Sequence, residues 1–200
     1  MVARIKKIIK VLIIPLLSTL TFINYGCSPA NILATGGGSA MVVAEGERTL
    51  GTVIDDATIK VNIAAKFLAA ENNLFVNINT SVLEGRVLLT GLVDNQEIRI
   101  DAVRIVWGVE GVQEIINEIE IGNRSSLKDY ASDLWINTQA RAVAAKTIGL
   151  KAITYNFETI QGKIYIAGIT TKPEQLEELI SALKIIKGVN EIVNYVIVKE

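Results

Sequence analysis

Histidine is absent from this chain of 200 residues, and cysteine occurs once, as Cys27. Without histidine, Ser–His and Cys–His nucleophile systems cannot form, and the commonest ligands of zinc are missing. One cysteine cannot close an intramolecular disulfide. Acids occur in adjacent pairs, but neighbours on a helix point to different sides and suit a helix cap or a solvated face; the pairs are Asp55–Asp56 and Glu177–Glu178. We expect no enzyme, no metal, no cofactor and no small-molecule substrate.

Basic residues are few once the first 26 positions are set aside. The remaining chain has 16 Lys and Arg against 21 Asp and Glu, a net charge of −5. A protein that binds nucleic acid needs a basic patch that neutralises phosphates, and no such stripe is present. The glycines at 36–38 lack the Lys-Ser/Thr sequel and the preceding strand of a phosphate-binding loop. Nucleic acid is therefore excluded as a partner.

The first 26 residues have the parts of a secretory signal peptide. Four basic residues and no acid precede an apolar run from Val11 to about Ile23. The run of about 13 residues is short for a membrane-spanning helix, which needs about 20, but it suits an export signal. The alternative is a short transmembrane anchor that is never cleaved. The small residue Gly26 at the break favours export.

Cys27 follows directly, in a setting that resembles the lipobox of bacterial lipoproteins. In those proteins a peptidase cuts before the cysteine, whose thiol then carries a diacylglycerol, so the resemblance implies lipidation of Cys27. They prefer Leu three positions before the cysteine, where this chain has Asn24. Ser28, in place of Asp, implies transfer to the outer membrane by resemblance to enterobacterial lipoproteins. Each buried acyl methylene contributes about 0.8 kcal/mol, so several chains hold a protein firmly to a bilayer.

An internal repeat determines the architecture. Shifted by 77 positions, residues 56–121 match residues 133–198 without a gap. GVQEIIN at 111–117 aligns with GVNEIVN at 188–194. A gapless match in which glycines pair with glycines indicates two copies of one fold. Matching pairs include Asp56/Asp133, Ile59/Ile136, Gly85/Gly162 and Gly91/Gly168.

The first helix of each copy is expected to bury one face. In the first copy it runs from about 56 to 70, with Ile59, Ile63 and Phe67 at four-residue spacing. In the second copy a helical wheel places Ile136, Ala140, Val143 and Thr147 on the buried side, with Ala144 about 80° from Ile136.

Two strands, a second helix and a last strand complete each copy. Gly85 tolerates the positive φ that a tight hairpin between the strands demands. Asp94 and Glu97 have capping-box spacing for the second helix. Thr171 and Glu174 have the same spacing in the second copy. The expected bounds in the first copy are 76–83 and 86–92 for the strands, after Asp94 to Gly111 for the helix, and 112–121 for the last strand.

This α-β-β-α-β order, the hairpin glycine, the glycine after the second strand (VLLTG, IYIAG) and the GV–EI–N ending resemble the BON-domain family. Within the family the resemblance is to outer-membrane lipoproteins with two such domains, and it covers about residues 49–199. It implies an α+β fold of two tandem domains, each with two helices on a three-stranded mixed sheet. The expected divisions are a signal peptide at 1–26, a lipidated N-terminus and linker at 27–54, domains at 55–122 and 133–200, and a linker at 123–132.

Trp135 lies beside the expected buried side of its helix, where the first copy has the small polar Thr58. Three interpretations compete. Trp135 covers the edge of its own core or packs against the first domain, or it contacts another protein, or it anchors at a membrane interface. Trp favours the headgroup region because its ring is apolar while its N–H needs a partner.

The family resemblance favours the membrane interpretation. In those lipoproteins the first helix of the second domain meets anionic phospholipid through a Trp in the same SDxWI context. Residues 55–122 hold five Lys and Arg against eleven acids, a net charge of −6, whereas residues 133–200 hold eight against seven, a net charge of +1. Each basic residue near an anionic bilayer contributes about 1 kcal/mol. The expected lipid-binding residues are Leu134, Trp135, Thr138, Gln139, Arg141, Ala142 and Lys146.

The resemblance implies an outer-membrane lipoprotein that faces the periplasm, binds anionic phospholipid membrane through its second domain and supports envelope integrity. The alternative is a periplasmic module that binds a protein of the envelope machinery, with Trp135 as a hot spot.

Overall fold

The computed structural model describes residues 49–70, 73–122 and 127–199. The expected signal peptide, the expected lipidation site Cys27 and the chain up to residue 48 lie outside these ranges. No helix of the described part is long and apolar enough to cross a membrane.

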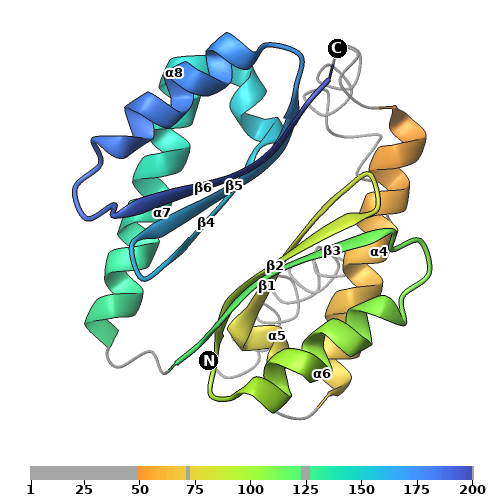
Figure 1. Cartoon of the computed structure of the whole chain (residues 1–200). Coiled ribbons are helices and arrows are strands. Elements are labelled where there is room, and N and C mark those ends of the chain that lie inside the picture. The colour runs from red at the N-terminus through yellow and green to blue at the C-terminus, as the bar shows by residue number, and fades with distance from the viewer. Residues whose placement is uncertain (1–48, 71–72, 123–126, 200) are drawn as a thin grey trace, which may run out of the picture. The chain divides into compact units, whose positions relative to one another are not determined.

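The first module covers one face of a sheet with helices (Figure 1). Its elements are α4 (Leu50–Ala69), α5 (Leu74–Asn77), β1 (Ile78–Leu83), β2 (Arg86–Val93), α6 (Gln96–Trp107) and β3 (Glu114–Ile121).

The second module repeats this order, with a short 3₁₀ helix, η2, in the place of α5 (Figure 1). Its elements are α7 (Leu127–Ile148), η2 (Gly149–Thr154), β4 (Asn156–Ile160), β5 (Lys163–Thr170), α8 (Pro173–Lys184) and β6 (Glu191–Val198).

Each module has a mixed sheet with its second strand in the middle. The strand orders are β1-β2-β3 and β4-β5-β6. The middle strand pairs antiparallel with the strand before it and parallel with the last strand. A parallel pair needs a long crossover, which α6 and α8 provide. These observations confirm the predicted α+β fold class with two helices on a three-stranded mixed sheet.

The core of the first module lies between its helices and its sheet. Ile59, Ile63 and Phe67 of α4 are buried, as their spacing predicts, in a cluster with Val87 and Leu89 of β2. This row is favourable because each fully buried aliphatic or aromatic side chain contributes about 1.5–3 kcal/mol.

The core face of α7 follows the same four-residue spacing. Val143 and Thr147 were expected on the buried side and are half-buried. The buried row consists of Ile136, Ala140, Ala144 and Ile148. The buried side is therefore rotated slightly from the prediction.

The β1–β2 hairpin turns at two residues with positive φ. Glu84 has φ 53° and Gly85 has φ 76°, as expected for a tight type I′ turn. Asp56 was expected at a helix cap or on a solvated face, and that prediction is wrong. The Asp56 carboxylate is buried within α4 and accepts the backbone N–H of Glu84 at 2.8 Å and of Gly85 at 2.9 Å.

Asp133 makes the same connection in the second module. Its carboxylate accepts the N–H groups of Gln161 and Gly162, both at 2.9 Å. Each module therefore fixes its first helix to its hairpin through one buried acid. The other predicted acid pair, Glu177 and Glu178, is exposed on α8, as expected for a solvated face.

Both first helices begin earlier than predicted. The Thr49 side chain accepts the N–H of Thr52 at 3.2 Å, which caps α4 so that it starts at Leu50. α7 starts at Leu127, inside the segment 123–132 that was expected to be a linker.

Two predicted helix caps are wrong. Asn95, in place of Asp94, caps α6, because its Oδ1 accepts the N–H of Ile98 at 3.0 Å. Thr171 does not cap α8, because the residue that precedes the first turn is Lys172, which makes no side-chain cap bond.

Two boundaries in the first module also differ from prediction. α6 ends at Trp107 and not at Gly111. Gly111 lies in the following loop with φ 91°, and a Cβ there would be 3.0 Å from the Ile59 side chain. Residues 76 and 77 belong to α5 and not to the first strand, because the left-handed Asn73 starts a helical turn there.

The two modules contact each other through the sheet faces that carry no helix. Leu83 and Leu88 of the first module form a buried cluster with Ala167 of the second, and Ile116 and Tyr195 pack against it. This packing, which the sequence did not predict, buries the second apolar face of each sheet.

Tyr165 shows how completely the second sheet is covered. Its neighbours Ile164 and Ile166 lie in the core beneath the helices, so Tyr165 points to the opposite face. It is nevertheless only 1% exposed. Because that face carries no helix of its own module, the first module must cover it.

Polar contacts accompany this apolar contact. Glu120 accepts hydrogen bonds from Lys163 Nζ at 2.9 Å and from the Tyr165 hydroxyl at 3.0 Å. The Tyr195 hydroxyl donates to Glu118. Burial, aided by this hydrogen bond, raises the pKa of Tyr195 to about 12. Two further bonds between the modules join Asn79 to Glu158 and Lys199 to Glu84.

Candidate functional site

α7 leaves Leu134 and Trp135 on the side opposite its core. Ile136 and Ala140 are buried, and residues one or two positions away from them point elsewhere on a helix. Leu134 is 56% exposed and Trp135 is 48% exposed. The Thr138 hydroxyl donates to the Leu134 carbonyl oxygen at 2.8 Å, which satisfies this polar group within the helix. Half of the Trp135 surface therefore remains accessible to a partner.

Three of the other expected site residues lie near Trp135 on the helix. Ala142 and Lys146 follow it by seven and eleven positions, which is close to two and three full turns. Both are exposed. Gln139 is half-buried at the border with the core. α7 thus exposes Ala142 and Lys146 on the side of Trp135.

Arg141 lies at the flank of this face. Its Nη2 donates to the Phe157 carbonyl oxygen of β4 at 3.1 Å. The guanidinium group therefore holds the helix to the edge strand of its own sheet, and only its remaining N–H groups can reach a ligand.

The matching position of the first module borders an open groove of about 610 Å³. Thr58, the counterpart of Trp135, lines it together with four acids. The acids are Asp55, Asp56, Glu84 and Glu110. They do not form a metal site, because the described ranges contain no group of three or more acids, cysteines or histidines that could hold a metal ion.

The second module replaces this acidic lining. The counterparts of the four acids are Ser132, Asp133, Gln161 and Lys187. Asp133 is buried and binds the hairpin, so the exposed charge among these positions is the positive one. The two modules share a backbone but differ in electrostatic potential at the same place.

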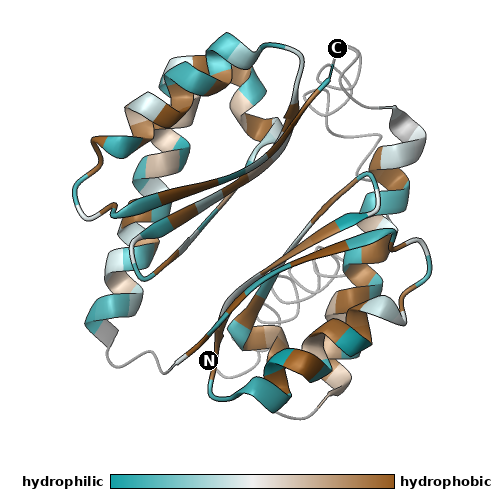
Figure 2. Cartoon of the chain, in the orientation of Figure 1, coloured by the Kyte–Doolittle hydropathy of each residue, from teal (hydrophilic) through white to brown (hydrophobic). Residues whose placement is uncertain are grey.

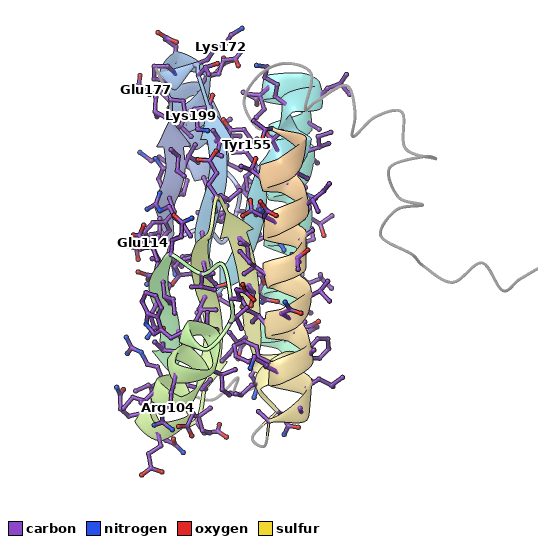
Figure 3. The ribbon with its side chains drawn as sticks, turned by 90° about the vertical axis from the view of Figure 1, so that its right-hand side faces the viewer. Arg104, Glu114, Tyr155, Lys172, Glu177 and Lys199 are labelled. Carbon is purple, nitrogen blue, oxygen red and sulfur yellow. The ribbon has the colours of Figure 1, made fainter. Side chains whose placement is uncertain are left out.

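The loop after α8 carries residues that the sequence analysis missed. Ile185 is 85% exposed, and Lys184 and Lys187 beside it are exposed as well. The repeats themselves could have indicated this loop, because the second copy has Lys187 where the first copy has Glu110. At the other end of α8, Lys172 is the N-cap residue and Glu177 lies in the second turn (Figure 3).

The first module exposes apolar residues of a different kind. Ile54, Val61 and Leu68 follow one another at seven-residue spacing along α4 and are 48%, 66% and 70% exposed. Figure 2 shows hydrophobic residues along this helix. The matching residues of α7 are Ala131, Thr138 and Ala145, so this apolar row is specific to the first module.

Both modules are similar in sequence to known proteins. The family described as BON domain matches residues 55–123 and again residues 132–200. "Uncharacterized protein in gshII 5'region" of Anaplasma centrale is 35% identical over 147 residues, which cover 73% of this chain and 96% of that protein. Outer membrane lipoprotein DolP of Haemophilus influenzae is 31% identical over 155 residues, or 77% of this chain and 79% of DolP.

A third relative is the 21 kDa hemolysin of Actinobacillus pleuropneumoniae, which is 28% identical over 153 residues, or 74% of this chain and 78% of that protein. The likeness in each case spans most of the relative, and the family match extends over both folded halves. The chain therefore belongs to the BON-domain family, with two such domains in tandem.

Proposed function

We propose that this protein is a lipoprotein of the outer membrane that faces the periplasm, and that its second BON module binds anionic phospholipid through the exposed face of α7. In this proposal Cys27 carries the acyl anchor. The similarity to a protein named as an outer membrane lipoprotein supports this location. The role is maintenance of envelope integrity and not catalysis.

One observation carries the proposal. Trp135 is half-exposed beside the exposed Leu134, on a helix that also carries Lys146. An indole ring with an apolar body and one N–H donor is suited to the headgroup region of a bilayer. The second module has a net charge of +1 and the first a net charge of −6, so an anionic surface attracts the second more than the first.

A weak contact is sufficient for an anchored protein. When one end of a chain is held in the bilayer, binding of a second site on the same chain becomes intramolecular, at an effective concentration set by the linker. The few basic residues of α7 can therefore orient the protein on the membrane even though they could not recruit it from solution.

The rival function is contact with a protein of the envelope machinery at the same surface. A half-exposed Trp is also the residue type that dominates protein–protein interfaces. The two functions differ in one observable, the depth of Trp135 in a bilayer of defined composition.

The test uses the native protein reconstituted into nanodiscs of phosphatidylcholine, with or without phosphatidylglycerol, so that the anchor is the same in both. The chain has two tryptophans, and Trp107→Phe leaves Trp135 as the only one. We expect its fluorescence to shift to the blue, and to be quenched by brominated lipid, only in discs that contain phosphatidylglycerol. Trp135→Phe leaves Trp107 of the first module as the control, which should stay unquenched. Unshifted and unquenched Trp135 emission in both discs would reject lipid binding and leave the protein-contact function, and equal quenching in both would reject the preference for anionic lipid.

A further inference from the structure

We propose that the loop between α8 and β6 is a second element of the lipid-contacting surface. In this proposal Ile185 inserts among the acyl chains, while Lys184 and Lys187 bind the phosphodiester of an anionic lipid beside Trp135. The inference rests on the proposed function and adds to it the residues that recognise the headgroup.

Ile185 is almost fully exposed to solvent. At 85% it has the largest exposed fraction among the large apolar side chains of the described residues. The next residue, Ile186, is buried and holds the loop to the core. When a membrane covers an apolar side chain that is otherwise held in water, the free energy of the system falls. Lysines on both sides keep their charged ends at the headgroups while their stems lie along apolar surface.

The loop runs directly over α7. Gly188 has φ 93°, and a Cβ at this position would be 3.2 Å from Cδ1 of Ile136, the residue next to Trp135. Figure 1 shows the segment between α8 and β6 beside α7. In the first module the counterparts of Trp135 and Lys187, Thr58 and Glu110, line the same groove. Trp135 and Lys187 therefore border one surface.

The charges decide which ligand this surface suits. The first module places Asp55, Glu84 and Glu110 around the groove, and these acids repel a phosphodiester. The second module has Ser132, Gln161 and Lys187 at the same positions. The substitutions remove three negative charges and add a positive one, which favours an anionic headgroup over a zwitterionic one.

The experiment places a reporter in the loop of the anchored, full-length protein. In the variant Trp107→Phe/Trp135→Tyr/Ile185→Trp the only indole is at position 185, and Tyr keeps an aromatic ring with a polar end at position 135. We expect brominated lipid to quench it in nanodiscs that contain phosphatidylglycerol and not in discs of phosphatidylcholine alone. The native Trp107, alone in Trp135→Tyr, is the matched control, because it is the counterpart of Lys184 in the first module.

A second variant tests the lysines. In the Trp107→Phe background, Lys184→Gln/Lys187→Gln should weaken the contact by about 30-fold and abolish quenching of Trp135. The control Lys60→Gln/Lys66→Gln removes the same charge from exposed positions on α4 and should leave quenching unchanged.

The outcomes separate the two proposals. Quenching of Trp135 without quenching at position 185 overturns the role of the loop and leaves the proposed function in place. Quenching at neither position rejects both. Equal quenching at position 185 in both kinds of disc, or an equal effect of the two lysine double variants, overturns recognition of a net negative headgroup by Lys184 and Lys187.

Discussion

Glu118 and Tyr195 occupy the same position in the two repeats, and the tyrosine hydroxyl donates a hydrogen bond to the glutamate. The two residues are 77 positions apart, which is the offset of the repeat. Contact between equivalent positions is the property of an interface with two-fold symmetry. The two modules are therefore arranged like the subunits of a symmetric dimer joined into one chain.

A second contact between the modules can be compared with its symmetry-related positions. Glu120 pairs with Lys163 at 2.9 Å across the interface. Their counterparts, Ile197 and Arg86, line one small cavity. Ile197 carries no charge, and Arg86 pairs with Glu114 of its own sheet at 2.6 Å, as Lys163 also does with the equivalent Glu191 at 3.3 Å. The symmetric geometry is kept, whereas the ion pair across the interface occurs on one side only.

Tyr195 should make stability depend on pH in the alkaline range. Its pKa rises from 10.0 to about 12 on folding, so the folded state holds the proton more tightly than the unfolded state. The stabilisation is complete below pH 10 and is lost as pH rises from 10 to about 12. Urea unfolding at increasing pH should show this loss, and Tyr195→Phe should reduce its slope. An unchanged slope in the variant would show that Tyr195 does not contribute.

Glu120→Ala should destabilise the protein by about 1–3 kcal/mol, because it leaves the buried Tyr165 hydroxyl without this acceptor and Lys163 with a weaker partner, Glu191. The control Glu114→Ala removes an ion pair whose carboxylate is 50% exposed, and it should cost less than about 1 kcal/mol. Urea midpoints of both variants measure the difference. Equal losses would mean that the polar contacts between the modules add nothing.

Asp133→Asn should cost about 2–3 kcal/mol, because an amide offers one acceptor oxygen where the carboxylate accepts the N–H groups of Gln161 and Gly162 with two. Asp56→Asn should behave alike in the first module. Its exposed neighbour provides the control, and Asp55→Asn should change stability by less than about 0.5 kcal/mol. The free energy of unfolding measures all three. A small effect at Asp133 would contradict the role of the buried acid.

Two glycines should respond to alanine in opposite directions. At Gly91, with φ 154°, a Cβ would be 2.2 Å from the Asn77 carbonyl oxygen, and Gly91→Ala should cost about 3 kcal/mol. At Gly51, within α4, the nearest atom is Thr49 Oγ1 at 3.8 Å, and Gly51→Ala should stabilise by about 0.5–1 kcal/mol. The melting temperature should therefore fall for Gly91→Ala and rise for Gly51→Ala. A tolerated alanine at Gly91 would contradict the close approach of the end of α5 to β2.

Part of the candidate site was predictable. The spacing of Ile136 and Ala140 places Trp135 off the core, and its exposure agrees with that wheel. Arg141 was also predicted to be a lipid-binding residue. Its hydrogen bond to the Phe157 carbonyl oxygen depends on the position of β4 in the fold, which a helical wheel cannot predict. Lys187 was missed because it lies 52 positions from Trp135, and only the packing of Gly188 on Ile136 brings the loop to the helix.

The sequence by itself determined the features that depend on neighbours along the chain. These are the repeat, the order of helices and strands, the buried row of α4 and the left-handed turn at Glu84 and Gly85. Periodicity and turn chemistry act over a few residues, so they can be recognised without knowledge of the fold.

The tertiary structure decided what covers each surface. The apolar runs of β2 and β5 show that both strand faces avoid water, but not that the second face of each sheet meets the other module. It also gave Asp56 and Asp133 their partners, which are 28 and 29 positions away along the chain. Such contacts are made by the burial of surface in three dimensions, and a buried group finds its partner only once the fold has formed.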